Sequence, residues 1–265
     1  MSWNLPSGID REPYLSFDNA ALKIEWAAAH LQQLNAICED FVNRKPYEVS
    51  IGKDAAGNQQ ILQVGMTQRF PANINLLAGD IVSNLRAALD FAWMGLIRSL
   101  TPPGAKAHKM TLPIGNDRKS LEATIAKSLV GKTFFEQTKD LLLSRIKSHH
   151  DFPSGGNKAI CALNELSNWN KHNLLIVALG ETSFIGNIGG TSFEGNAFVG
   201  GIQNIMAWKG VDRDLVESIK PSFQIVFGDH KFVKNQPLIP TLAELCVSSM
   251  DALQAFREVF PISKS

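Results

Sequence analysis

The stretch from Ser16 to Asn43, SFDNAALKIEWAAAHLQQLNAICEDFVN, decides the fold class of this chain. Its apolar residues recur at spacings of three and four, which is typical of one buried face of an α-helix. Ser16 or Asp18 can cap the start of this helix, and Pro46 follows its end. We predict a long helix whose apolar stripe lines the core. The stripe consists of Ala20, Ile24, Ala27, Leu31, Leu34, Cys38 and Phe41.

A second long helix is predicted from about Asn73 to Leu100, between Pro71 and the pair Pro102-Pro103. A third begins at Thr241, where Thr241-Leu-Ala-Glu244 has the pattern of a capping box, and ends before Pro261. Shorter helices are expected near 119–130, near 134–149, and after Gly155-Gly156-Asn157. Gly131 suits the end of the first of these, and Thr133-Phe-Phe-Glu136 suits the start of the second.

Alternating residues predict strands between the helices. Tyr47–Ile51 and Ile61–Met66 flank a Gly/Asn turn and read as an antiparallel hairpin. Short, glycine-punctuated segments at 180–210 and the run Ser222–Phe227 predict further antiparallel strands. The sum is an α+β fold, mainly α, in which a helical bundle carries a β-hairpin and a small antiparallel sheet. We expect one domain over 1–265, with a helical core at 16–180 and 238–260 and a β-rich portion at 181–237. A helical part with a β-rich appendage is the alternative.

Composition limits the function classes. The 265 residues include 26 Lys+Arg and 25 Asp+Glu, a formal charge of +1, so there is no global electrostatic case for binding nucleic acid or acidic membranes. The three cysteines, Cys38, Cys161 and Cys246, lie in predicted helices and are expected to be buried free thiols. The first residues lack the apolar region of a signal peptide, and no apolar run reaches the ~18 residues of a membrane span. A cytoplasmic protein is expected.

Two polar segments interrupt the apolar patterns. On the second long helix, Asp80 and Asn84, and likewise Arg86 and Asp90, are four residues apart and can pair. Either a packing salt bridge or the floor of a polar pocket fits that arrangement. The other segment, Asn168-Trp169-Asn170-Lys171-His172, is interpreted as a break before a new helix, which would place Lys171 and His172 unfavourably in a first turn. Such a breach of a local rule marks either a functional site or a buried partner, for example Asp90.

Arg145-Ile-Lys-Ser-His-His150 is the third polar segment. An Arg followed at this distance by a His near a helix end resembles the spacing in HEPN-type ribonucleases, although Ile146 stands where a polar residue is usual. Arg145 would stabilise phosphate charge and His150 would transfer a proton. A metal site at His149-His150-Asp151 is disfavoured, because adjacent helical residues point apart. Phosphate-binding, hydrolase-elbow and metalloprotease motifs are missing, and no cofactor is expected.

The ordered motifs resemble a group of uncharacterised bacterial proteins. Those proteins carry Arg-Ser-Ala-Leu-Asp-His, Phe-Pro-Ile and Asn-x-Asp-Lys-His segments, and the resemblance covers roughly residues 18–180. It implies that Arg86 and Asp90 lie near Asn168, Lys171 and His172. Here Phe91 replaces the His and Asn170 the Asp of the group's pattern, and both changes remove an ionisable group. The matching segments in this chain are Gly79–Trp93, Leu112–Ile114 and Leu163–His172.

Two functions remain open from the sequence. The first is a non-catalytic binding or interaction protein whose motifs form a polar network joining two helices. The second is an RNA-cleaving or nucleotide-processing enzyme of toxin or defence type, in which Arg145 with His150, or Arg86 with Lys171 and His172, would hold the phosphate. A small-ligand pocket lined by tryptophans is a third arrangement. RNA, a protein or a second copy of the chain are the partners considered.

Overall fold

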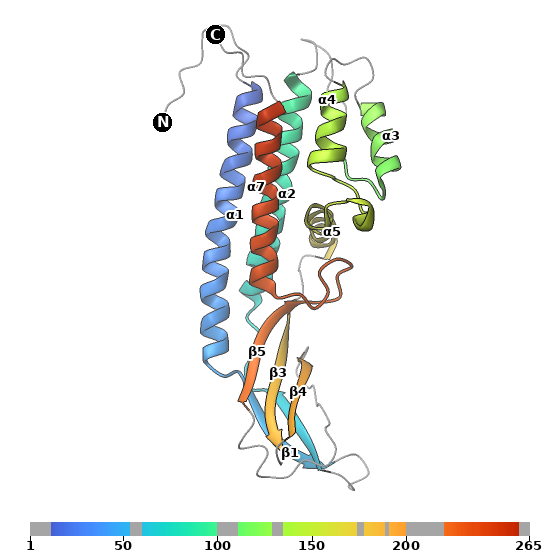
Figure 1. Cartoon of the computed structure of the whole chain (residues 1–265). Coiled ribbons are helices and arrows are strands. Elements are labelled where there is room, and N and C mark those ends of the chain that lie inside the picture. Colours follow the sequence, from blue (N-terminus) through green and yellow to red (C-terminus); the bar gives the residue numbers. More distant parts are fainter. Residues whose placement is uncertain are drawn as a thin grey trace. The chain divides into compact units, whose positions relative to one another are not determined.

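The structure is a computed structural model that describes residues 12–53, 60–99, 111–128, 135–173, 178–188, 191–199 and 220–259 (Figure 1). These residues are mainly helical, as predicted. The predicted features at Gly131, Thr133, Pro102 and Pro103 lie outside them. The helices are α1 (Glu12–Asn43), α2 (Ala72–Ser99), α3 (Arg118–Ser128), α4 (Phe135–Asp140), α5 (Lys158–Asn173) and α7 (Leu238–Val259).

The long helices follow the apolar periodicity. In α1 the predicted stripe is buried at Ala20, Ile24, Ala27, Leu34, Cys38 and Phe41, and the helix ends at Asn43 as expected. It begins at Glu12, so the prediction that Ser16 or Asp18 caps its start is wrong. In α2 the side chains of Ile81, Leu85, Leu89 and Leu96 are buried. Each stripe therefore contributes directly to the core.

The predicted start of α7 is wrong by about one turn. The helix begins at Leu238, so Thr241 lies inside it, and its N–H donates to the carbonyl of Pro237 over 3.1 Å. Pro240 occupies the first turn, where a missing N–H costs nothing because the first four N–H groups of a helix have no partner within it. The Thr241–Glu244 pattern was therefore not the cap.

The predicted helix at 134–149 is shorter than expected. α4 continues into a π-helical turn, Leu141–Arg145, in which Leu141, Leu142 and Leu143 are buried. The chain then leaves the helix, because Lys147 takes a positive φ of 55°. A positive φ at a residue with a Cβ is incompatible with a continuing right-handed helix.

α5 begins where the sequence predicted. Oδ1 of Asn157 accepts the N–H of Ile160 over 3.1 Å, and its Nδ2 donates to the carbonyl of Ile146 over 3.1 Å. Asn157 thus caps α5 and ties its start to the end of the π-helical turn. The neighbouring Gly156 cannot carry a side chain, because a Cβ there would overlap the carbonyl oxygen of His149.

The strands are antiparallel throughout the described residues. β1 (Tyr47–Lys53) pairs with β2 (Gln60–Met66), with Tyr47 opposite Met66. β3 (Ala178–Ile188) lies between β4 (Thr191–Val199) and β5 (Lys220–Phe227), which gives the order β4-β3-β5. The last residues of β5, Ile225, Val226 and Phe227, are buried.

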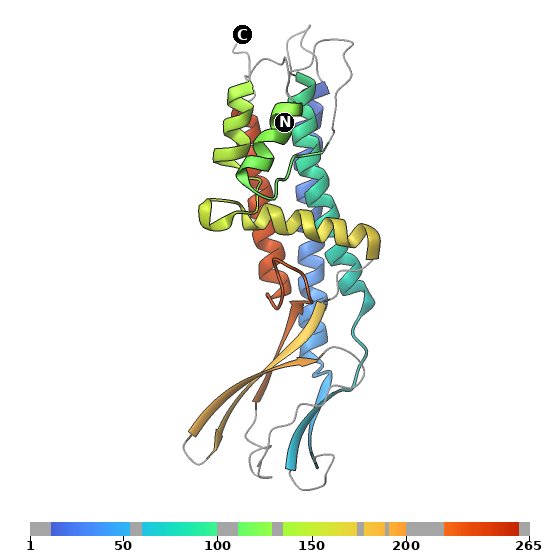
Figure 2. The same ribbon diagram turned by 90° about the vertical axis from the view of Figure 1, so that its right-hand side faces the viewer.

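The chain packs as two compact units. Unit 1 contains residues 1–30, 79–174 and 242–265, and unit 2 contains 31–78 and 175–241. Unit 2 therefore groups the β1–β2 pair with the three-stranded sheet, whereas the sequence grouped it with the helical core. In unit 1, α1, α2 and α7 run side by side and α5 crosses them (Figures 1 and 2).

Candidate functional site

Arg86 and Asp90 together hold the backbone of Leu112. Nη2 of Arg86 lies 3.0 Å from Oδ1 of Asp90 and donates to the carbonyl of Leu112 over 3.0 Å. The same carboxylate oxygen accepts the N–H of Leu112 over 2.8 Å. The two side chains, one turn apart on α2, therefore satisfy both backbone groups of one residue in the segment that leads to α3. Arg86 pairs with Asp90, as their spacing indicated. The further group that both residues bind is the backbone of Leu112 and not a side chain.

This pair is largely removed from water. The Arg86 side chain is 8% exposed and that of Asp90 is 24% exposed. Burial raises the pKa of Asp90, and the charge of Arg86, the N–H of Leu112 and the charge of Lys171 act against that rise. Burial likewise lowers the pKa of Arg86, against the opposing effect of Asp90. The cost of desolvation is thus the largest influence on both groups, as is usual for buried ion pairs.

Arg86 has one buried group that the pair does not engage. Its Nη1 finds no hydrogen-bond acceptor among the described residues. A buried donor of this kind is costly.

The segment Asn168–His172 does not break a helix. It forms the end of α5, which runs unbroken to Asn173, and the prediction of a new helix start is wrong. Lys171 and His172 consequently lie in the last turn, where positive charge is favourable to the helix dipole. The unfavourable placement of two cations in the first turn of a helix, which the sequence led us to expect, is therefore not present.

The contact between α5 and α2 is made by Asn170. Its Nδ2 donates to Oγ of Ser83 over 3.2 Å and approaches the carbonyl of Gly79 at 3.4 Å. A Cβ on Gly79 would lie 2.7 Å from Oδ1 of Asn170, so a larger residue there would force the Asn170 side chain to move. Two contacts therefore start from α2. The pair of Arg86 and Asp90 holds the segment at Leu112, and Ser83 with Gly79 holds α5 through Asn170.

The other residues of the two motifs are placed as follows. The positive charge of Lys171 reaches Asp90 and lowers the pKa of that carboxyl, although Lys171 itself is exposed. Asn168 and His172 are exposed. On α2, Nδ2 of Asn84 donates to the carbonyl of Asp80 over 2.8 Å, and Lys23 of α1 donates to Oδ1 of Asn84 over 2.9 Å.

Arg145 and His150 have separate surroundings. Arg145, at the end of the π-helical turn, forms an ion pair with Glu258 of α7. The ring of His150 lies beside Phe152, with centroids 6.5 Å apart. The guanidinium that would stabilise a phosphate is thus held by a carboxylate.

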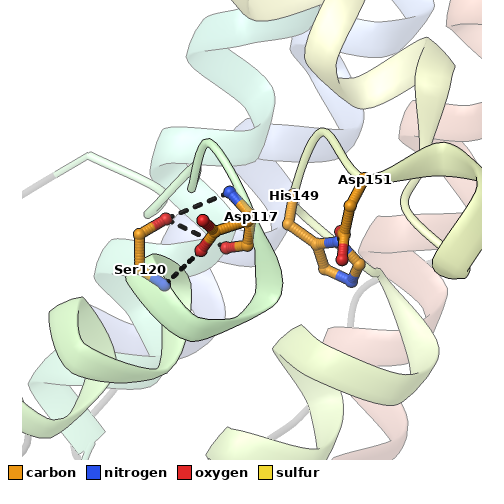
Figure 3. A network of polar contacts seen from close by, with 4 residues as sticks. All are labelled: Asp117, Ser120, His149 and Asp151. Atoms are coloured by element: carbon orange, nitrogen blue, oxygen red, sulfur yellow. Dashed lines mark hydrogen bonds and ion pairs between the residues drawn. The ribbon is translucent and has the colours of Figure 1, made fainter.

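A polar cluster surrounds His149, a residue that entered the predictions from the sequence only as part of a disfavoured metal site. This residue is 1% exposed, its Nδ1 contacts the carboxylate of Asp151, and burial lowers its pKa, aided by the charges of Arg118 and Lys147 (Figure 3). Nearby, Asp117 caps α3 by accepting the N–H of Ser120 over 2.6 Å, while Oγ of Ser120 accepts the N–H of Asp117 over 3.1 Å (Figure 3). The signal for the cap was present, since Asp117 and Ser120 have capping-box spacing.

Backbone contacts join this cluster to the Leu112 segment. Gly115 donates its N–H to the carbonyl of Ser148 over 2.9 Å and forms a parallel bridge with His149. The described residues contain no group of three or more His, Cys, Asp or Glu arranged to hold a metal ion. The bond from Gly115 to Ser148 thus joins the segment before α3 to the segment before α5, beside the contact of His149 with Asp151.

Comparisons of the chain with protein-family models, with curated proteins and with solved structures find no match. Among the described helices, none is both long and apolar enough to cross a membrane.

Proposed function

We propose that this chain is a cytoplasmic, non-catalytic binding protein, built as a helical bundle with a β-hairpin and a small antiparallel sheet. The observation that carries the proposal is that Arg86 and Asp90 both form hydrogen bonds to the backbone of Leu112. A group that binds a phosphate or moves a proton must reach the reacting atoms. The guanidinium of Arg86 is 8% exposed and holds a backbone carbonyl, which supports a role in joining segments of the chain.

The ion pair at Arg145 supports the same proposal. A ribonuclease mechanism needs a positive group free to meet the phosphate. Arg145 is paired with Glu258, and burial of Arg86 leaves it no access to a polynucleotide backbone. The motif residues are therefore better explained as fixing the fold than as catalysing a reaction.

An RNA-cleavage assay tests this proposal against the enzymatic alternative. The full chain is incubated with single-stranded and structured RNA, alongside Arg145→Ala, His150→Ala and His172→Ala. We expect all four proteins to leave the RNA intact. Cleavage by the unaltered chain that disappears in the His150→Ala or His172→Ala variant would refute the proposal.

A double-mutant cycle tests the structural role of the pair. We expect Arg86→Ala and Asp90→Ala to be coupled by about 1 kcal/mol or more in the free energy of unfolding, because both act on Leu112. The cycle of Asp90→Ala with Lys171→Ala serves as the comparison, with a coupling below about 0.5 kcal/mol, since Lys171 is exposed. Additive effects of Arg86 and Asp90 would contradict a joint structural role.

A further inference from the structure

Apolar side chains are exposed together on α1 and α7 of unit 1. The described residues contain six large exposed apolar side chains, and four of them belong to these two helices. Leu22 is 60% exposed, Trp26 58%, Val247 61% and Met250 43%. Scattered exposed apolar residues are common, but a concentration on neighbouring helices marks an interaction surface.

An ion pair links the two helices that carry these residues. Asp18 of α1 and Arg257 of α7 lie 3.9 Å apart, so both point toward the boundary between the two antiparallel helices. Leu22 follows Asp18 by one turn, and Met250 precedes Arg257 by two, so each shares a face with its member of the pair. The two helices are antiparallel and have the same rise per residue. Glu25, seven residues after Asp18, therefore lies level with Met250, seven residues before Arg257.

Acidic residues outnumber basic residues on the unit 1 parts of α1 and α7. The parts of α1 and α7 that belong to unit 1 contain two basic residues, Lys23 and Arg257. Lys23 donates to Asn84 and Arg257 pairs with Asp18. The same stretches contain six acidic residues, of which Asp18 pairs with Arg257 and Glu258 pairs with Arg145; the six are Glu12, Asp18, Glu25, Glu244, Asp251 and Glu258. Three of the others, Glu25, Glu244 and Asp251, are exposed and flank the apolar side chains: Glu25 is beside Trp26, and Glu244 and Asp251 are within one turn of Val247.

We propose that the face formed by Leu22, Glu25, Trp26, Glu244, Val247, Met250 and Asp251, here called the α1–α7 face, binds an amphipathic helix with basic residues beside its apolar stripe. The apolar stripe of a third helix can pack across two neighbouring helices. Lysine or arginine residues on the flanks of that helix would meet the carboxylates. This inference rests on the proposed binding function and names the chemistry of the partner.

Charge disfavours two other occupants. A second copy using the same face would bring carboxylates against carboxylates in an isologous dimer. An anionic membrane surface would be repelled for the same reason. The chain as a whole carries a formal charge of +1, so the attraction for a basic helix comes from this face and not from the net charge.

The test uses a fluorescein-labelled helical peptide of leucine and lysine, with leucines at the spacing of one helix face, and a matched peptide in which glutamate replaces lysine. Binding to the full chain is followed by fluorescence anisotropy at low and high salt. We expect the lysine peptide to bind, the glutamate peptide not to bind, and salt to weaken the complex. Equal binding of the two peptides would overturn the proposal.

Substitutions locate the binding surface. Leu22→Ser and Val247→Ser should each raise the dissociation constant about tenfold, since truncation of a central apolar contact commonly has that effect. Leu76→Ser is the matched control, because Leu76 is 56% exposed on α2 and outside the α1–α7 face, and it should leave binding unchanged. Glu25→Gln and Asp251→Asn should weaken binding and reduce its salt dependence. Equal loss of binding in Leu76→Ser would refute the site.

The remaining outcomes separate this inference from the proposed function. Self-association of the chain that is lost in Val247→Ser, or binding to phosphatidylserine vesicles, would identify a different occupant and overturn the inference. Failure of the lysine peptide to bind, with RNA left intact, refutes the inference alone. Cleavage of RNA that depends on His150 or His172 refutes the proposed function, whatever the peptide does.

Discussion

Asp90 contributes to the structure as a hydrogen-bond acceptor more than as a charge. Burial raises its pKa, which means that the folded protein tolerates the protonated carboxyl better than the unfolded chain does. The oxygen that accepts the N–H of Leu112 is present in either protonation state. Removing the acceptor should therefore be more harmful than removing the negative charge.

We predict that Asp90→Ala destabilises the protein by about 2–3 kcal/mol and Asp90→Asn by a smaller amount. The alanine leaves the N–H of Leu112 without an acceptor, whereas asparagine retains one. Urea unfolding followed by circular dichroism measures both, and Asp80→Ala, at an exposed position on the same helix, is the control. Equal losses for the two Asp90 variants would show that charge dominates.

Gly79 and Asn170 form a second residue-scale pair. In an isolated helix, alanine is more favourable than glycine by about 1 kcal/mol. Here a Cβ on Gly79 would displace Asn170 from its hydrogen bonds to Ser83 and Gly79. The gain in helix propensity is thus offset by the loss of a tertiary contact.

We predict that Gly79→Ala stabilises the protein by about 1 kcal/mol only in the Asn170→Ala background. In the unaltered chain the same substitution should be neutral or destabilising, because the gain is cancelled by the lost hydrogen bonds. Thermal unfolding of the four proteins of the cycle gives the coupling. An equal gain in both backgrounds would mean that Asn170 does not restrain α5 against α2.

At the level of elements, α3 depends on its cap. The carboxylate of Asp117 accepts the N–H of Ser120, which lowers the pKa of Asp117 below its ordinary value. A lowered pKa in the folded state means that the ionised form stabilises α3. This contribution is complete above the unfolded pKa of about 3.9 and is lost as the pH falls through the folded pKa.

We therefore predict that Asp117→Asn is less stable than the unaltered chain at neutral pH and that the difference disappears in acid. Asparagine preserves the cap but cannot carry the charge that favours a helix N-terminus. Stability measured between pH 2 and 7 on both proteins, with Asp140→Asn as an exposed control, provides the comparison. A difference that grows as the pH falls would contradict this assignment.

For the whole molecule, the reactivity of the three cysteines can show when each of the two units unfolds. None of the three, all of which lie among the described residues, forms a disulfide; Cys38 and Cys161 are buried and Cys246 is partly so. Cys38 belongs to unit 2, and Cys161 and Cys246 belong to unit 1. Burial raises the pKa of the Cys38 thiol to about 12, so little of the reactive thiolate exists at neutral pH.

We predict that N-ethylmaleimide at pH 7.5 modifies Cys38 and Cys161 only after unfolding. Since α1, α2 and α7 each contribute residues to both units, the two thiols should become reactive at the same urea concentration. Mass spectrometry of peptides across a urea series measures each site. Modification of Cys38 well before Cys161 would show that unit 2 opens independently of unit 1.

Local patterns were sufficient for the long helices and for the pairing of Arg86 with Asp90. Burying one face of a helix imposes a spacing of three and four residues, and side chains four residues apart share a face. The helices and the ion pair can therefore be recognised from the sequence alone. The cap at Asn157 is equally local. The start of α7 was misplaced because a capping-box pattern also occurs inside helices, where tertiary packing extends the first turn.

Packing alone determined the rest of the site. Arg86 and Asp90 hold Leu112 through backbone atoms that every residue possesses, so no side chain identifies that partner in the sequence. α5 continues through Asn168 to Asn173, and Asn170 packs on Gly79, a contact 91 positions distant in the chain. Contacts between distant segments override local preferences of this size, which are worth only tenths of a kcal/mol per residue.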